Sequence, residues 1–146
     1  MNRQRTQRLQ LLVDIARRSE DDAARVLSEK RSAMNAAFAR AQEIQEYYAD
    51  YHAQFSARTA ALRAADIMAS RGFLAQLDGA LKSQQHQCRL TQHEFERARA
   101  TWRQCHLKHK AIMDYRDRCV IDDQQRDARY EQKLMDELSG LSKGRF

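Results

Sequence analysis

Three side chains in the second half of the chain, Cys105, His106 and His109, are of types that could bind a metal ion. Residues four apart share a helix face, so Cys105 and His109 can point the same way. A structural zinc site needs four ligands in a tetrahedral array, and no nearby pair completes the set. We therefore interpret Cys105 and His109 as members of a helix–helix seam, and predict no metal site and no bound cofactor.

The sequence also offers no catalytic constellation. It has no Gly-rich phosphate loop and no His-Glu-x-x-His motif. The helical architecture argued below would not form a concave pocket in which a substrate could be held. We predict that the chain is not an enzyme.

The charge is basic but evenly mixed. Twenty-six Lys and Arg residues against 20 Asp and Glu give a net charge of +6. Lys and Arg are dispersed among Asp and Glu along the chain, with no cluster of one sign on a clear face, and no known nucleic-acid module is present, so no nucleic-acid partner is predicted. No segment is apolar enough for a membrane span, and the start does not look like a secretory signal. Three widely spaced cysteines fit a reducing cytoplasm.

The elements that must position any site are helices. The chain has no proline and only four glycines among 146 residues, which is typical of a protein that is helical nearly throughout. Much of its 42% hydrophobic content is alanine, too little bulk for a compact globule of this length. A slender helical protein is predicted.

Two seams of apolar or small residues follow the three-four alternation of a coiled coil. The first contains two successive steps of four, which predicts a stutter at Ser19, Ala23 and Leu27. Its members are Leu9, Leu12, Ala16, Ser19, Ala23, Leu27, Lys30, Met34, Ala37, Ala41, Ile44, Tyr48, Tyr51, Phe55, Arg58 and Leu62. The second is unbroken and comprises Leu74, Leu77, Leu81, Gln84, Cys88, Thr91, Phe95, Ala98, Trp102, Cys105, His109, Ile112, Arg116, Cys119, Asp123, Arg126 and Tyr130.

The segment between the seams has no turn residues, so one straight rod and a hairpin both remain open on propensity alone. We favour a hairpin because two complementary seams can pair without a second chain. The predicted fold is an all-α, two-helix antiparallel coiled coil with helices at about 4–58 and 64–139 and a turn within 58–65. We expect a single domain over 1–146, with a frayed tail at 140–146, and a monomer when free.

Short groups of residues along the chain resemble the FliJ family of flagellar type III export proteins. No single group is specific, but their order and spacing match over nearly the whole chain. The residues are Asp21-Asp22-Ala23-Ala24-Arg25 with Leu27, Tyr47 and Tyr51, Phe73-Leu74 with Leu77, Ala80 and Gln84, Trp102, Gln132-Lys133 and Met135-Asp136-Glu137.

The resemblance implies an antiparallel two-helix coiled coil similar to the central-stalk subunit of rotary ATPases. It implies a cytoplasmic protein at the inner-membrane export apparatus, without membrane insertion. The implied partners are the export ATPase hexamer (FliI type), the export gate protein (FlhA type) and flagellar export chaperones. A chaperone or chaperone escort is an alternative role, and a related injection-type secretion stalk is another. A plain homodimeric coiled coil with no export role is a third possibility.

The resemblance places export-gate binding near the hairpin tip. Two stripes could form one contact face, made of Arg40, Ile44, Tyr47 and Tyr51 on the first helix and Phe73, Leu77, Ala80 and Gln84 on the second. The alternative is that Tyr47 and Phe73 are only the flanks of a wide packing seam. Arg40 and Gln84 depart from the residue types associated with their positions.

Basic residues near both termini suggest a second contact. Cations are disfavoured at a helix N-terminus, so local stability does not explain Arg3, Arg5 and Arg8. They are either a solubilising start of the chain or part of a basic collar for acidic loops of the ATPase ring. The collar would consist of Arg3, Arg5, Arg8, Arg126, Arg129 and Lys133, together with Lys143 and Arg145.

Overall fold

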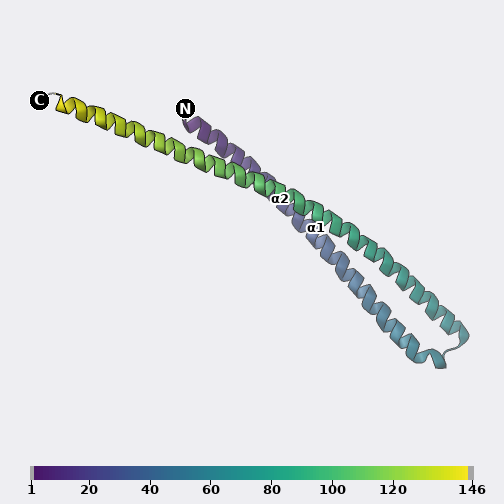
Figure 1. Cartoon of the computed structure of the whole chain (residues 1–146). Helices are drawn as coiled ribbons and strands as arrows, with labels where there is room; N and C mark the ends of the chain where they lie inside the picture. Colours follow the sequence, from purple (N-terminus) through teal and green to yellow (C-terminus); the bar gives the residue numbers. More distant parts are fainter. Residues whose placement is uncertain (1, 145–146) are drawn as a thin grey trace. The chain divides into compact units, whose positions relative to one another are not determined.

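Two long helices make up the computed structural model, which describes residues 2–144. Helix α1 spans Asn2–Arg58, a 3-10 turn η1 spans Thr59–Ala61, and helix α2 spans Ala64–Lys143 (Figure 1). No strand occurs among these residues, which confirms the predicted all-α hairpin. Helix α2 continues four residues past the predicted end at 139. Arg145 and the last residue of the predicted tail lie outside the described residues.

The connection between the helices needs no glycine. Thr59 Oγ1 donates a hydrogen bond to the carbonyl oxygen of Phe55 at 2.7 Å, and Leu62 N donates to the carbonyl oxygen of Thr59 at 3.4 Å. Leu62 then turns to an extended backbone, with φ −89° and ψ 147°. Every described residue keeps a negative φ, so ordinary L-residues can form this turn. The predicted turn within 58–65 is confirmed.

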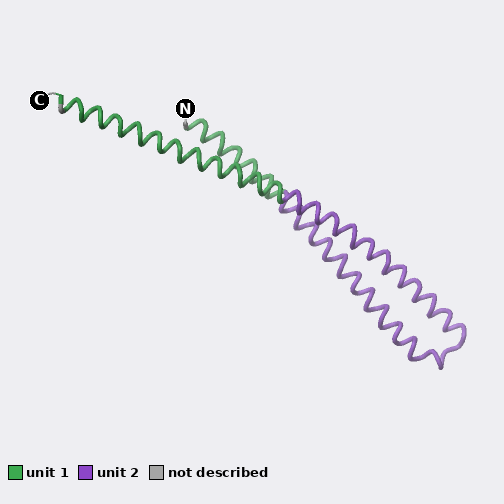
Figure 2. Tube along the Cα trace, viewed as in Figure 1, with its two compact units in different colours: residues 1–22, 103–146 green, residues 23–102 purple. Residues whose placement is uncertain are grey.

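The chain divides into two compact units (Figure 2). Unit 1 combines residues 1–22 with 103–146, and unit 2 consists of residues 23–102. Each unit contains one segment of α1 and one of α2, and unit 2 also contains η1.

Unit 1 packs around Val13, whose side chain is fully buried at 0% exposure. The neighbouring Leu12 is 49% exposed, and Ser19 is exposed while Glu20 is half-buried. Within unit 1 the predicted seam was therefore wrong at two positions, where Val13 replaces Leu12 and Glu20 replaces Ser19. The predicted seam residue Arg58, at the end of α1, is exposed as well. With Val13 and Glu20, the α1 seam alternates steps of three and four without a stutter. A carboxylate suits the seam here because two imidazoles of α2 donate hydrogen bonds to it, as shown below.

Unit 2 packs mainly through small side chains, which let the two helices approach closely. Ala37 and Ala98 are buried, and the side-chain amide of Gln84 donates a hydrogen bond to the carbonyl oxygen of Ala37 at 3.0 Å. A more exposed ion pair joins Lys30 Nζ to Glu94 Oε2 at 3.3 Å. The contact with Ala37 gives the polar seam residue Gln84 a specific partner on α1.

The predicted α2 seam is at least half-buried at every position from Leu74 to Asp123. It ends there, because Arg126 and Tyr130 are exposed, and their assignment to the seam was wrong. At this end an ion pair joins Arg5 Nη2 to Asp123 Oδ1 at 3.2 Å. Gln124 and Asp127 still line a groove with Arg3 of α1, and α2 then continues beyond the start of α1.

Candidate partner-binding surfaces

Three rings form an aromatic cluster in unit 2, with Tyr47 and Tyr51 from α1 and Phe73 from α2. The ring of Phe73 lies 4.7 Å from that of Tyr51 and 6.3 Å from that of Tyr47, both edge-on. Such edge-to-face pairs contribute roughly 0.5–1.5 kcal/mol of stabilisation beyond that from the surface area that the rings bury. The hydroxyl group of Tyr51 also donates a hydrogen bond to Ser70 Oγ at 3.5 Å. Phe73 and Tyr51 are half-buried, whereas Tyr47 is 56% exposed.

The remaining residues of the two predicted gate-binding stripes differ in exposure. Arg40 and Ala80 are exposed, and Ile44 and Leu77 are half-buried. Gln84 is half-buried and its amide is engaged by the backbone of α1, so it contributes to helix pairing. The structure thus joins the stripes through Tyr47, Tyr51 and Phe73, and the other members surround that contact.

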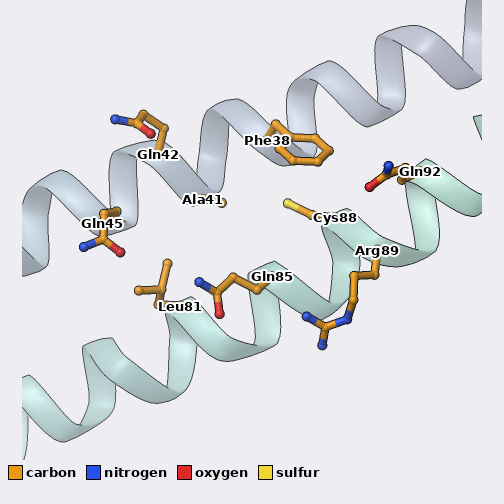
Figure 3. Close-up of a pocket in the computed structure, with 9 residues that line it drawn as sticks. All are labelled: Phe38, Ala41, Gln42, Gln45, Leu81, Gln85, Cys88, Arg89 and Gln92. Atoms are coloured by element: carbon orange, nitrogen blue, oxygen red, sulfur yellow. The ribbon is translucent and has the colours of Figure 1, made fainter.

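A groove of about 560 Å³ also lies between the helices of unit 2 (Figure 3). Its base holds the buried Leu81 and Cys88, and its wall holds the exposed ring of Phe38. Glutamine amides dominate the polar lining, Arg89 is the charged member, and no lining residue is acidic. The nine lining residues are Phe38, Ala41, Gln42, Gln45, Leu81, Gln85, Cys88, Arg89 and Gln92.

The groove and the aromatic cluster use different faces of α1. Phe38 and Tyr47 are nine residues apart, which places them ~180° apart at about 100° per residue. Sequence reasoning did not single out Phe38. The available signal was the recurrence of Phe38, Ala41, Gln42 and Gln45 at helical spacing beside the seam.

A polar contact in unit 1 joins Glu20 of α1 to two histidines of α2. His106 Nδ1 lies 3.0 Å from Glu20 Oε1, and His109 Nδ1 lies 2.6 Å from Glu20 Oε2. Because an ionised carboxylate only accepts, each ring nitrogen is the donor. The hydrogen bond from His106, and next that from His109, holds the pKa of Glu20 below its ordinary value of 4.5.

The residues first considered as metal ligands therefore lie in helix–helix contacts. Cys105 Sγ lies 3.5 Å from Ser19 Oγ, and His109 contacts Glu20. Within residues 2–144, no three side chains of ligand type are placed to hold a metal ion. Glu20 was missed because a carboxylate in a seam is recognised only once its partners are known.

The basic residues at the start of α1 are exposed, and one of them already has a partner. Arg5 is paired with Asp123 of α2, and Asp123 is buried. Arg3 and Arg8 are exposed on α1, as are Arg126, Arg129 and Lys133 on α2. The predicted collar members are thus all in unit 1, although the charge of Arg5 is partly compensated. Arg145 and the side chain of Lys143 lie outside what the structure describes.

Comparison with known protein families identifies the family of this chain. The sequence model described as "Flagellar FliJ protein" matches residues 5–145, nearly the whole chain. The chain belongs to the FliJ family. Membership gives it a role related to flagellar export and places it in a non-catalytic family. No curated protein and no solved structure gave a match.

The FliJ family match includes α1 apart from its first three residues, the whole of α2 and both candidate surfaces of unit 2. It also includes all the predicted gate-binding residues and, apart from Arg3, the predicted collar residues. Neither described helix contains a stretch long and apolar enough to cross a membrane. The identification therefore extends over the candidate binding surfaces without assigning a partner to any of them.

Proposed function

We propose that the chain is a non-enzymatic coiled-coil stalk of the flagellar type III protein export apparatus. It links the export ATPase hexamer of FliI type to the export gate protein of FlhA type, promotes assembly of the ATPase ring and activates the gate. It acts in the cytoplasm, at the inner-membrane export apparatus. The observation that supports the gate contact is the aromatic cluster of Tyr47, Tyr51 and Phe73, in which Tyr47 is exposed.

The cluster has the physical properties of a binding anchor. Aromatic side chains dominate the energetics of many interfaces because they bury much area with few rotatable bonds. Phe73 packs against both tyrosines, so the exposed face of Tyr47 is held in one orientation before a partner arrives. Such preorganisation lowers the entropy lost on binding.

Replacing Tyr47 by alanine is expected to weaken binding to the cytoplasmic domain of the gate protein at least tenfold. An interface hot spot contributes about 2 kcal/mol or more, and about 1.4 kcal/mol already corresponds to a tenfold change in Kd. Helicity should remain unchanged because Tyr47 is largely exposed. Phe73→Ala should weaken binding equally, and titration calorimetry with circular dichroism measures both effects.

Tyr115→Ala is the matched control for this experiment. Tyr115 is 52% exposed, similar to Tyr47, but lies in unit 1. The control should bind the gate protein normally. Normal binding by Tyr47→Ala, or equal loss of helicity and binding, would assign the cluster to packing.

The ATPase contact has a separate test in the basic collar. Arg3→Glu combined with Arg8→Glu is expected to reduce stimulation of the ATPase severalfold, because the change reverses two exposed charges that attract acidic loops. Arg5 is left intact since it pairs with Asp123. The control is Arg97→Glu with Arg99→Glu in unit 2, where both residues are exposed. Undiminished stimulation by the first variant would contradict the collar.

A chaperone escort is the second candidate, and the groove around Phe38 favours it. An apolar base with amide edges and no acidic lining suits an amphipathic helix that carries a carboxylate for Arg89. One-to-one binding to export chaperones that is lost in Phe38→Ala would support the escort. Binding to the ATPase hexamer at substoichiometric ratio would support the stalk. An injection-type secretion stalk would bind the corresponding ATPase of that system.

A further inference from the structure

The last segment of α2 in unit 1 is an apolar helix face without a described partner. Every described residue from Gln124 to Ser142 is exposed, after the buried Asp123. Figure 2 shows this part of unit 1 as a single helix that extends beyond the start of α1. Large apolar side chains nevertheless recur along it, at Tyr130, Leu134, Leu138 and Leu141, with exposures from 42% to 68%. We call these four residues the terminal stripe.

The terminal stripe continues the face of α2 that α1 covers. Tyr130, Leu134 and Leu141 follow Asp123 by seven, eleven and eighteen residues. At about 100° per residue, all three lie within ~20° of Asp123 around the helix axis. The stripe thus extends the helix–helix interface on α2 beyond the first residues of α1.

The two edges of the terminal stripe carry opposite charges. Arg126 and Lys133 lie along one edge, and Glu131 lies along the other. Asp127 lies on the face itself, where it lines a groove with Arg3 of α1. In a parallel two-fold pair of helices, each edge faces the opposite edge of the partner. Arg126 would then face Glu131 of the partner subunit, five residues further along, as in g-to-e pairs of coiled coils. An antiparallel pair would bring edges of the same kind together.

We propose that two copies of the chain pair through their terminal stripes as a parallel, two-stranded coiled coil. The sequence predicts a monomer when free, and the pairing proposed here departs from that prediction, because the terminal stripe lies outside the hairpin seam that pairs within one chain. The stripe extends over only about 17 Å at 1.5 Å per residue, well below the length of a stable obligate dimer. Glu137 lies at the same face and meets its counterpart in the pair. The association is therefore weak and reversible, and it does not depend on the proposed function.

Sedimentation velocity of the full chain over a wide range of concentration tests the pairing. The weight-average sedimentation coefficient should rise with concentration. Leu134→Asp combined with Leu141→Asp should weaken association at least tenfold. Leu107→Asp is the control, since Leu107 is 58% exposed in the same unit but outside the stripe. Glu137→Leu should strengthen association because it completes the apolar three-four pattern from Tyr130 to Leu141.

Charge reversal tests the parallel arrangement. Arg126→Glu should weaken pairing, and Arg126→Glu with Glu131→Arg should restore it. A double variant that stays as weak as the single one would overturn the parallel arrangement. A chain that stays monomeric at every concentration, also with Glu137→Leu, would overturn the pairing itself. Protection of the terminal stripe from hydrogen exchange only when the ATPase is added would assign it to that partner instead.

Discussion

Val13→Asp is expected to unpair α1 from α2 in unit 1, whereas Leu12→Asp should change stability little. Val13 is fully buried in the seam, so an aspartate there would place an unpaired charge among apolar side chains. An uncompensated buried charge lowers the free energy of unfolding by about 3–5 kcal/mol. Leu12 is 49% exposed, so the same charge remains in water. The two residues are adjacent and differ mainly in the direction of their side chains.

Thermal unfolding followed by circular dichroism measures this difference. A loss of that size should lower the midpoint for Val13→Asp by roughly 10 °C, at the 2–4 °C per kcal/mol usual for chains of 150–250 residues. Equal losses for the two variants, or a larger loss for Leu12→Asp, would support the seam that contains Leu12. The pair therefore tests the register of α1 directly.

Glu20→Gln is expected to destabilise unit 1 by about 2 kcal/mol, because hydrogen bonds to a charged group contribute about 1.5–3 kcal/mol each and the amide keeps part of them. Glu20 is mostly buried, and both carboxylate oxygens are engaged by histidines of α2. Asp21→Asn removes a neighbouring exposed carboxylate and should have almost no effect. Denaturant unfolding of the three proteins gives the comparison. Equal stability of Glu20→Gln and Asp21→Asn would show that the contact contributes nothing.

The contribution of Glu20 to the free energy of unfolding should also decrease as the pH falls. Its pKa is lower in the folded chain than the ordinary value of 4.5, owing to His106 and then His109. The folded state therefore binds the proton less readily than the unfolded state, and ionised Glu20 stabilises the fold above about pH 4.5. This stabilisation is lost as the pH falls through the lower folded-state pKa. The difference in unfolding free energy between the wild type and Glu20→Gln should shrink over that range.

The sequence predicted the elements of this fold well because proline and turn signals are absent and the apolar spacing persists. The helix ends at Arg58 and Ala64 agree with the predicted positions. The error in the first seam arose because Leu12 and Ser19 look more suitable than Val13 and Glu20 when one helix is considered alone. Only the pairing with α2 decides which of two adjacent residues faces the partner.

The candidate surfaces were partly predictable. Tyr47, Tyr51 and Phe73 stand out by residue type, and in the structure the ring of Phe73 meets those of both tyrosines. The contact of Glu20 with His106 and His109 could not be predicted in the same way, because it joins residues 86 and 89 positions apart. It depends on the antiparallel register, which a single helical pattern does not contain.

The two units differ in the chemistry of their interfaces, and this difference affects the cooperativity of unfolding. The carboxylates of Glu20 and Asp123 and the guanidinium of Arg116 lie at the interface of unit 1, whereas that of unit 2 depends on alanine, leucine and aromatic packing. Acid weakens the first interface by protonating Glu20, whose pKa is lowered in the folded chain by His106 and then His109, whereas apolar packing does not depend on pH. Calorimetry at low pH should then show two overlapping transitions, with a van't Hoff enthalpy smaller than the calorimetric enthalpy. One continuous hairpin can thus lose the structure near its termini while the end that bears the aromatic cluster stays folded.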